Sequence, residues 1–154
     1  MSKENSTNAP TSYGSDSAET TQAAASSIVG SMPAVSGASI IALSGDLGAG
    51  KTQFAKGVAR ALGIARTITS PTFLIMRSYK ASLGPWEHLF HLDCYRLEDP
   101  QELRVLGWDE IVANPKNLIV VEWAERVSAL LPPSTVWVEL EVVSPTKRTI
   151  TVRP

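Results

Sequence analysis

At residues 45–52 the chain reads Gly45-Asp46-Leu47-Gly48-Ala49-Gly50-Lys51-Thr52. This segment fits G-x-x-x-x-G-K-[ST], the pattern of a phosphate-binding loop, in which glycines let the backbone turn several N–H groups towards an anion. Lys51 can reach the outer phosphates of a nucleotide, and the Thr52 hydroxyl can hold a magnesium ion. The segment therefore predicts a site for nucleotide phosphates.

The residues on either side have the strand–loop–helix order that such a loop requires. Residues 39–44 predict a short buried strand, and residues 52–62 predict a helix with one apolar face that ends at Gly63. The N-terminal end of this helix adds positive potential where phosphates bind. A glycine-rich turn that matches the pattern by chance is the alternative, and the flanking strand and helix argue against it.

Length and composition exclude several classes of protein. The 154 residues are enough for one domain with a sizeable core, and the net charge of −1 gives no global electrostatic reason to bind nucleic acid or a membrane. No apolar run reaches the roughly 20 residues of a membrane helix, and the one cysteine, Cys94, suits a reducing cytoplasm. We expect a cytoplasmic protein with a disordered tail at residues 1–14 and a single domain at residues 15–154.

Two predicted strands end in a carboxylate. Residues 87–92 alternate as a strand does and lead to Asp93. A second strand begins at Asn117, is continuously apolar over residues 118–121, which is typical of a central parallel strand, and leads to Glu122. An apolar run followed by a carboxylate is the usual form of the metal-binding strand in phosphate-loop enzymes, so Asp93 and Glu122 compete for that role. His91 by itself is more typical of a hydrogen-bonded structural histidine than of a catalyst.

The remaining segments complete an α/β pattern. Asp16 and Glu19 have the spacing of a capping box and predict a helix that begins near Asp16. Residues 68–73 have two equally good interpretations. They are a loop before a strand at residues 73–79, or a switch segment whose hydroxyls sense a terminal phosphate. Helices are expected at residues 99–107, 108–113 and 124–131, and an antiparallel hairpin at residues 135–143 and 148–153.

Four motifs in this order resemble one family. They are Leu-Ser-Gly-Asp-Leu-Gly-Ala-Gly-Lys-Thr at residues 43–52, Ser-Pro-Thr-Phe at 70–73, His-Leu-Asp-Cys-Tyr-Arg-Leu at 91–97 and Val-Glu-Trp-Ala-Glu at 121–125. Together they resemble the TsaE family, small ATPases of bacterial tRNA threonylcarbamoyladenosine synthesis, over roughly residues 16–153. The resemblance implies a three-layer α/β domain of the P-loop NTPase type, with a mixed, mainly parallel central sheet and a C-terminal antiparallel hairpin.

The resemblance also implies an activity and partners. It implies a weak Mg²⁺-dependent ATPase, activated by the larger proteins TsaB and TsaD, which transfer a threonylcarbamoyl group to the adenosine next to the anticodon of certain tRNAs. This chain would meet tRNA indirectly, through that complex, and its ATP cycle would support the complex.

Site residues follow from the same motifs by position. The resemblance implies that the backbone of residues 45–50 and Lys51 hold phosphates, and that Thr52 and Glu122 hold magnesium with Asp93 close by. Lys51, Asp93 and Glu122 are the implied catalytic residues. Further threonines belong to the implied nucleotide site, namely Thr72 in the switch segment and Thr20 or Thr21 near the base, with Thr20 taken as the site residue.

Other nucleotide-binding classes fit less well. A GTPase is disfavoured because the chain has no N-K-x-D guanine motif. A small-molecule P-loop kinase shares the loop, but no Arg-rich lid follows the core. A nucleotide-gated binding module, in which hydrolysis is incidental, remains an alternative to the ATPase. Arg96 is a candidate for a stabilising arginine supplied by the chain itself.

Overall fold

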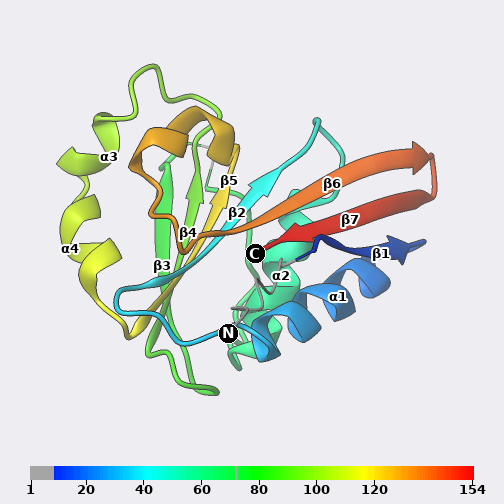
Figure 1. The fold of residues 1–154 in the computed structure, drawn as a ribbon, viewed down its shortest axis with the longest axis horizontal. Helices are drawn as coiled ribbons and strands as arrows, with labels where there is room; N and C mark the ends of the chain where they lie inside the picture. Colours follow the sequence, from blue (N-terminus) through cyan, green and yellow to red (C-terminus); the bar gives the residue numbers. More distant parts are fainter. Residues whose placement is uncertain (1–8, 72) are drawn as a thin grey trace, which may run out of the picture.

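The computed structural model describes residues 9–71 and 73–154, and within this part the strands form one sheet. The order across the sheet is β1-β7-β6-β2-β5-β4-β3 (Figure 1). The strands are β1 (Thr11–Ser15), β2 (Ser39–Ser44), β3 (Met76–Lys80), β4 (His88–Asp93), β5 (Asn117–Glu122), β6 (Val136–Ser144) and β7 (Lys147–Arg153). The helices are α1 (Ala18–Gly30), α2 (Lys51–Ala61), α3 (Glu102–Val105), α4 (Trp108–Ala113) and the 3₁₀ helix η1 (Ala124–Leu130).

The centre of the sheet is parallel and its edges are antiparallel. β2 pairs in parallel with β5 and β6, and β5 pairs in parallel with β4. β2 and β5 are apolar and buried along almost their whole length, as expected for strands covered on both faces. The antiparallel pairs are β3 with β4, β6 with β7, and β7 with β1. The predictions of a mixed, mainly parallel central sheet and a C-terminal hairpin are confirmed.

Helices cover both faces of the sheet and make three layers (Figure 1). Alternate residues of β5 show the division, because Val120 packs in the cluster that contains α1 and α2, and Val121 packs in the cluster that contains α3, α4 and η1. Each face thus has its own hydrophobic core. The predicted three-layer α/β class is confirmed, and no helix of residues 9–71 and 73–154 is long and apolar enough to cross a membrane.

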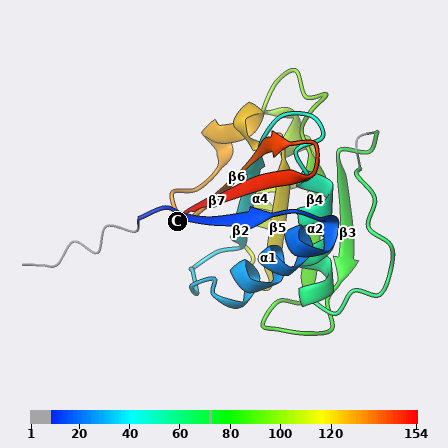
Figure 2. The same cartoon turned by 90° about the vertical axis from the view of Figure 1, so that its right-hand side faces the viewer.

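The predicted boundary of the ordered domain at residue 15 is too late. β1 begins at Thr11 and pairs with β7 in the register Thr11↔Val152, so the prediction of a disordered segment is wrong for residues 11–14 (Figure 2). Local composition misses this strand because its stability comes from the unpaired edge of β7, which offers backbone N–H and C=O groups to any adjacent segment. Residues 1–8 of the predicted tail lie outside the described residues.

Three element boundaries also differ from the predictions. α1 is capped by Ser17, whose Oγ accepts from the Thr20 backbone N–H at 3.1 Å, and not by Asp16. β3 begins at Met76 because Ile75 has a left-handed backbone (φ 64°) that ends the preceding turn. The helix expected at residues 124–131 is a 3₁₀ helix that ends one residue earlier, at Leu130.

Candidate functional site

The loop at residues 45–50 connects β2 to α2 and depends on its glycines. Gly45, Gly48 and Gly50 all have positive φ, at 146°, 80° and 104°. A Cβ on Gly45 would lie 2.4 Å from the backbone oxygen of Leu140 in β6. The loop therefore packs directly against a neighbouring strand, and only glycine fits at its first position.

Lys51 is the first residue of α2 and turns back over the loop. Its Nζ donates to the backbone oxygens of Gly45 and of Asp46, the latter at 3.0 Å, and lies 4.1 Å from the centroid of the Trp123 ring. Burial lowers the pKa of Lys51, while the surrounding carboxylates, Glu122 foremost, oppose that effect. The ammonium group is thus held at the loop by acceptors and an aromatic face.

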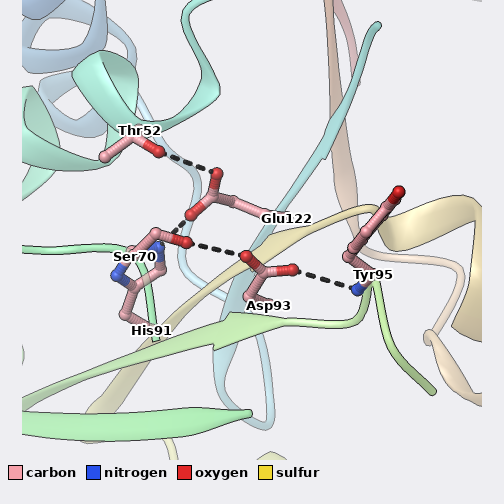
Figure 3. Close-up of polar contacts among 6 residues, drawn as sticks. All are labelled: Thr52, Ser70, His91, Asp93, Tyr95 and Glu122. Atoms are coloured by element: carbon pink, nitrogen blue, oxygen red, sulfur yellow. Dashed lines mark hydrogen bonds and ion pairs between the residues drawn. The ribbon is translucent and has the colours of Figure 1, made fainter. Parts of the chain in front are cut away.

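Glu122 ends β5 beside the first turn of α2 (Figure 3). Thr52 Oγ1 donates to Glu122 Oε1 at 3.2 Å, and His91 Nε2 lies 2.6 Å from Glu122 Oε2. The Glu122 side chain is 4% exposed, so these two contacts compensate for the burial of a charge. The predicted pair of Thr52 and Glu122 is in direct contact.

Asp93 ends β4 and lies directly across from Glu122 in the parallel register. Ser70 Oγ donates to Asp93 Oδ2 at 2.7 Å, and the backbone N–H of Tyr95 donates to Asp93 Oδ1 at 3.0 Å (Figure 3). Two carboxylates at the same edge of neighbouring strands repel each other, and each has its own donors. The two carboxylates predicted to compete are therefore neighbours with different partners.

A cavity of about 490 Å³ opens between the loop and the two carboxylates. It is lined by Leu47, Gly48, Gly50, Lys51, Thr52, Gln53, Ser70, Asp93, Tyr95, Glu122 and Trp123. Trp123 has a left-handed backbone (φ 56°), and its ring contacts that of Tyr95 at a centroid distance of 4.9 Å. Non-glycine residues seldom adopt this conformation, and strain of this kind concentrates at functional sites.

A second cavity of about 330 Å³ adjoins the first and shares Gly48, Gly50 and Gln53 with it. Its other walls are the start of α1 and the β6–β7 turn: Asp16, Ser17, Ala18, Thr21, Pro145, Thr146 and Arg148. The Arg148 guanidinium donates to the Gly48 backbone oxygen at 3.2 Å, which ties this turn to the loop. The two cavities together extend from the carboxylates to the N-terminal end of α1.

The structure brings most of the predicted site residues together. Lys51, Thr52, Asp93 and Glu122 line the larger cavity with the loop residues Leu47, Gly48 and Gly50. Gly45, Asp46 and Ala49 belong to the same loop but do not line that cavity. Thr20 lines neither cavity beside the loop, whereas Thr21 lines the second one. Thr72 lies outside the described residues.

Sequence reasoning missed three members of the site. Gln53 follows the loop pattern and carries no signal of its own, and Tyr95 lies in a motif whose recognisable feature is Asp93. Arg148 is 100 residues from Gly48, whose backbone oxygen it contacts, and no local sequence pattern predicts that contact. Arg96, the candidate arginine, is exposed and stacks on the Phe73 ring at 4.6 Å, and it does not line the cavity.

Comparison with known proteins gives a consistent result. The family model described as "Threonylcarbamoyl adenosine biosynthesis protein TsaE" matches residues 15–150. The tRNA threonylcarbamoyladenosine biosynthesis protein TsaE of Treponema pallidum is 42% identical over 114 residues, which are 74% of this chain and 81% of that protein. The Bacillus subtilis protein of the same name is 40% identical over 112 residues, which are 73% of this chain and 67% of that protein.

A solved structure agrees with the sequence relatives. The crystal structure of Bacillus subtilis YdiB superposes with a TM-score of 0.74 and 29% sequence identity, and the match covers 94% of this chain and 84% of that one. The family model spans nearly the whole described domain, and it includes the loop and both carboxylates. This chain belongs to the TsaE family.

Proposed function

We propose that this chain binds ATP with Mg²⁺ in the two adjoining cavities and hydrolyses it slowly, as a partner-activated step in the threonylcarbamoylation of tRNA. The observation that carries the proposal is the hydrogen bond from Thr52 Oγ1 to Glu122 Oε1. It joins the first turn after the phosphate-binding loop to the end of the neighbouring parallel strand. This is the arrangement in which phosphate-loop NTPases hold their metal.

The loop fits a chain of phosphates. Three glycines with positive φ keep its backbone free of side chains, and a Cβ at Gly48 would meet no atom within 4 Å, so the space above the loop is open to a ligand. The loop leads into α2, whose N-terminal end favours an anion. Lys51 lines the same cavity and supplies the positive charge for the outer phosphates.

The donor set also fits magnesium. Because Thr52 gives its hydroxyl hydrogen to Glu122, the oxygen lone pairs of Thr52 remain available to a cation. No cluster of three or more His, Cys, Asp or Glu side chains within residues 9–71 and 73–154 has the geometry of an all-protein metal site. A site of one hydroxyl and one carboxylate, completed by phosphate oxygens, is typical of Mg²⁺ rather than of Zn²⁺.

The second cavity is the proposed position of the base and ribose. It begins at Gly48 and Gly50, where the phosphates would end, and Thr21, Ser17 and Arg148 offer polar groups around it. Thr21 replaces Thr20 in this assignment because Thr21 lines the cavity and Thr20 does not. Of the two threonines that the resemblance implies near the base, the proposal therefore takes Thr21.

Hydrolysis of the terminal phosphate requires that the reacting groups be positioned and that the charge of the phosphate oxygens be neutralised. A bound Mg²⁺ would neutralise charge on the phosphate oxygens as the terminal bond breaks. Lys51 would hold the transferring group from the loop side. Asp93, fixed by Ser70 and by the Tyr95 backbone N–H, would accept a hydrogen bond from the attacking water and orient it.

Slow turnover by the isolated chain follows from the charges at the site. The described residues that line the larger cavity include one cation, Lys51, and no arginine. An arginine supplied by a partner is worth about a thousandfold or more in phosphoryl transfer. We therefore propose that TsaB and TsaD complete the site, and that tRNA is reached through them.

The surface beside the cavity supports a partner at this position. Leu47 lines the larger cavity and is 84% exposed, and Phe73, also 84% exposed, stacks against Arg96 next to the lining residue Tyr95. Exposed apolar side chains of this size at a functional cavity are typical of protein-binding surfaces. The proposed setting is the cytoplasm, since Cys94 is a free, buried thiol that suits a reducing compartment.

Two carboxylate variants test the assignment of roles. Glu122→Ala is expected to abolish ATP hydrolysis while metal-free nucleotide binding stays close to that of the unmodified chain, because Glu122 acts through the metal. Asp93→Ala is expected to retain Mg²⁺-dependent nucleotide binding and to lose turnover. If Glu122→Ala is fully active and Asp93→Ala binds no Mg²⁺, the two roles are reversed.

A further inference from the structure

His91 lies under the carboxylate that the proposed function assigns to magnesium. It occupies β4, next to β5, and is 0% exposed. Its Nε2 lies 2.6 Å from Glu122 Oε2, a short contact between two buried side chains (Figure 3). His91 begins the motif at residues 91–97, but the resemblance assigns it no role, and the sequence favours a structural role for it.

The hydrogen on Nε2 can be assigned from the surroundings of the ring. A carboxylate oxygen only accepts, so Nε2 is the donor in the contact with Glu122. Within the described part of the chain, the buried Nδ1 of His91 has no hydrogen-bond partner. A bare lone pair at Nδ1 costs less than a buried N–H without an acceptor, which favours the tautomer with its hydrogen on Nε2.

The two contacts of Glu122 constrain opposite ends of its carboxylate. Oε1 faces Thr52 and Oε2 faces His91, so the group cannot rotate without breaking a hydrogen bond. Asp93, the register partner of Glu122 across the strands, is a second negative charge beside it. A carboxylate without the His91 donor would be buried with less compensation beside this second negative charge.

We propose that His91 is a positioning residue, whose Nε2–H holds Glu122 so that Oε1 stays at the Thr52 hydroxyl and would be available to a bound metal. The inference rests on the magnesium role proposed above for Thr52 and Glu122. Hydrogen-bond partners of metal-binding side chains commonly set metal affinity in this way, by fixing orientation and basicity. His91 contacts neither phosphate nor metal in this proposal and acts only through Glu122.

Two variants of His91 separate the hydrogen bond from the space that the ring fills. His91→Phe keeps an aromatic ring and removes the donor, and His91→Gln returns an amide N–H near the position of Nε2. The probe is Mn²⁺, whose affinity for the chain saturated with ADP is measured by electron paramagnetic resonance. ADP affinity in EDTA, measured by calorimetry, reports on the phosphate-binding loop without the metal.

His91→Phe is expected to weaken Mn²⁺ binding about 10- to 100-fold, the usual effect of losing such a partner, with ADP affinity in EDTA nearly unchanged. His91→Gln is expected to bind Mn²⁺ nearly as tightly as the unmodified chain does. In a Glu122→Ala background, His91→Phe should add no further loss of Mn²⁺ affinity, because the residue through which it acts is gone.

Two results would overturn the inference while leaving the proposed function intact: Mn²⁺ affinity that is the same in His91→Phe and the unmodified chain, or equal losses of Mn²⁺ and metal-free ADP binding. If circular dichroism shows that His91→Phe does not fold, His91→Asn replaces it, since its amide lies near Nδ1 and should bind Mn²⁺ more weakly than His91→Gln. Equal Mn²⁺ affinity of the Asn and Gln variants would then refute the inference. An unmodified chain that binds ADP but no Mn²⁺ would refute the proposed magnesium site itself.

Discussion

Replacing Gly45 by alanine tests whether the loop needs glycine where it leaves β2. Gly45 has φ 146°, a conformation that side chains rarely allow. The added Cβ would lie 2.4 Å from the backbone oxygen of Leu140 and 3.2 Å from the Cβ of Ala49. The first of these atoms belongs to the backbone of β6 and cannot move aside as a flexible side chain does, so the loop or the strand must shift.

Two costs add at this position. The backbone strain of a non-glycine residue in such a region is about 1–3 kcal/mol. The overpacking against Leu140 costs about 1–3 kcal/mol more. We therefore expect Gly45→Ala to lower the free energy of unfolding by roughly 2–6 kcal/mol, a large part of the 5–15 kcal/mol of a typical domain.

Urea unfolding followed by circular dichroism measures this loss, and Gly48→Ala is the matched control. Gly48 lies in the same loop with φ 80°, but a Cβ there would meet no atom within 4 Å. Gly48→Ala is therefore expected to lower the free energy of unfolding only by the cost of a left-handed backbone, about 1–2 kcal/mol. The reasoning is refuted if Gly45→Ala loses no more stability than Gly48→Ala.

Two further predictions concern packing and reactivity. Gly57→Ala should destabilise the fold by about 1–3 kcal/mol in urea unfolding, because the new Cβ would lie 2.4 Å from the backbone oxygen of Gln22, where α1 crosses α2. Gly30→Ala, at the end of α1 with no atom within 4 Å, should change stability by at most about 1 kcal/mol, and a larger loss there would contradict the packing argument. Cys94 should resist iodoacetamide at pH 8, because burial, assisted by the nearby carboxylates, raises the pKa of its thiol to about 12. Mass spectrometry should find the label only when urea is present, and rapid labelling of the folded chain would show that the thiol is accessible.

Much of the fold and the core of the site follow from local sequence patterns. The apolar run of β5 predicts a central parallel strand, since only burial on both faces tolerates it, and the run of β2 predicts a short buried strand. Parallel strands end at one edge of a sheet, and for this reason the order of the strands along the chain is enough to place Asp93 and Glu122 beside the loop.

The features that local patterns miss depend on contacts between distant segments. β1 exists because β7 has an open edge, and His91 in β4 reaches Glu122 diagonally on the neighbouring strand β5. Arg148 meets the loop only because the β6–β7 turn folds back over it. Thr21 rather than Thr20 lines the second cavity because Ser17 caps α1, and the rotation of the helix decides which threonine faces inward. Tertiary geometry of this kind leaves no periodic signal in a single sequence.

The most direct measurement is ATP hydrolysis by the purified chain, alone and then with TsaB, TsaD and tRNA, with Lys51→Ala as the control. A Mg²⁺-dependent rate that is low for the chain alone, rises with the partners and disappears in Lys51→Ala is the expected result. ATP binding without any response to the partners would favour a kinase or a nucleotide-gated binding module. A rate that is unchanged in Lys51→Ala would contradict hydrolysis at the loop.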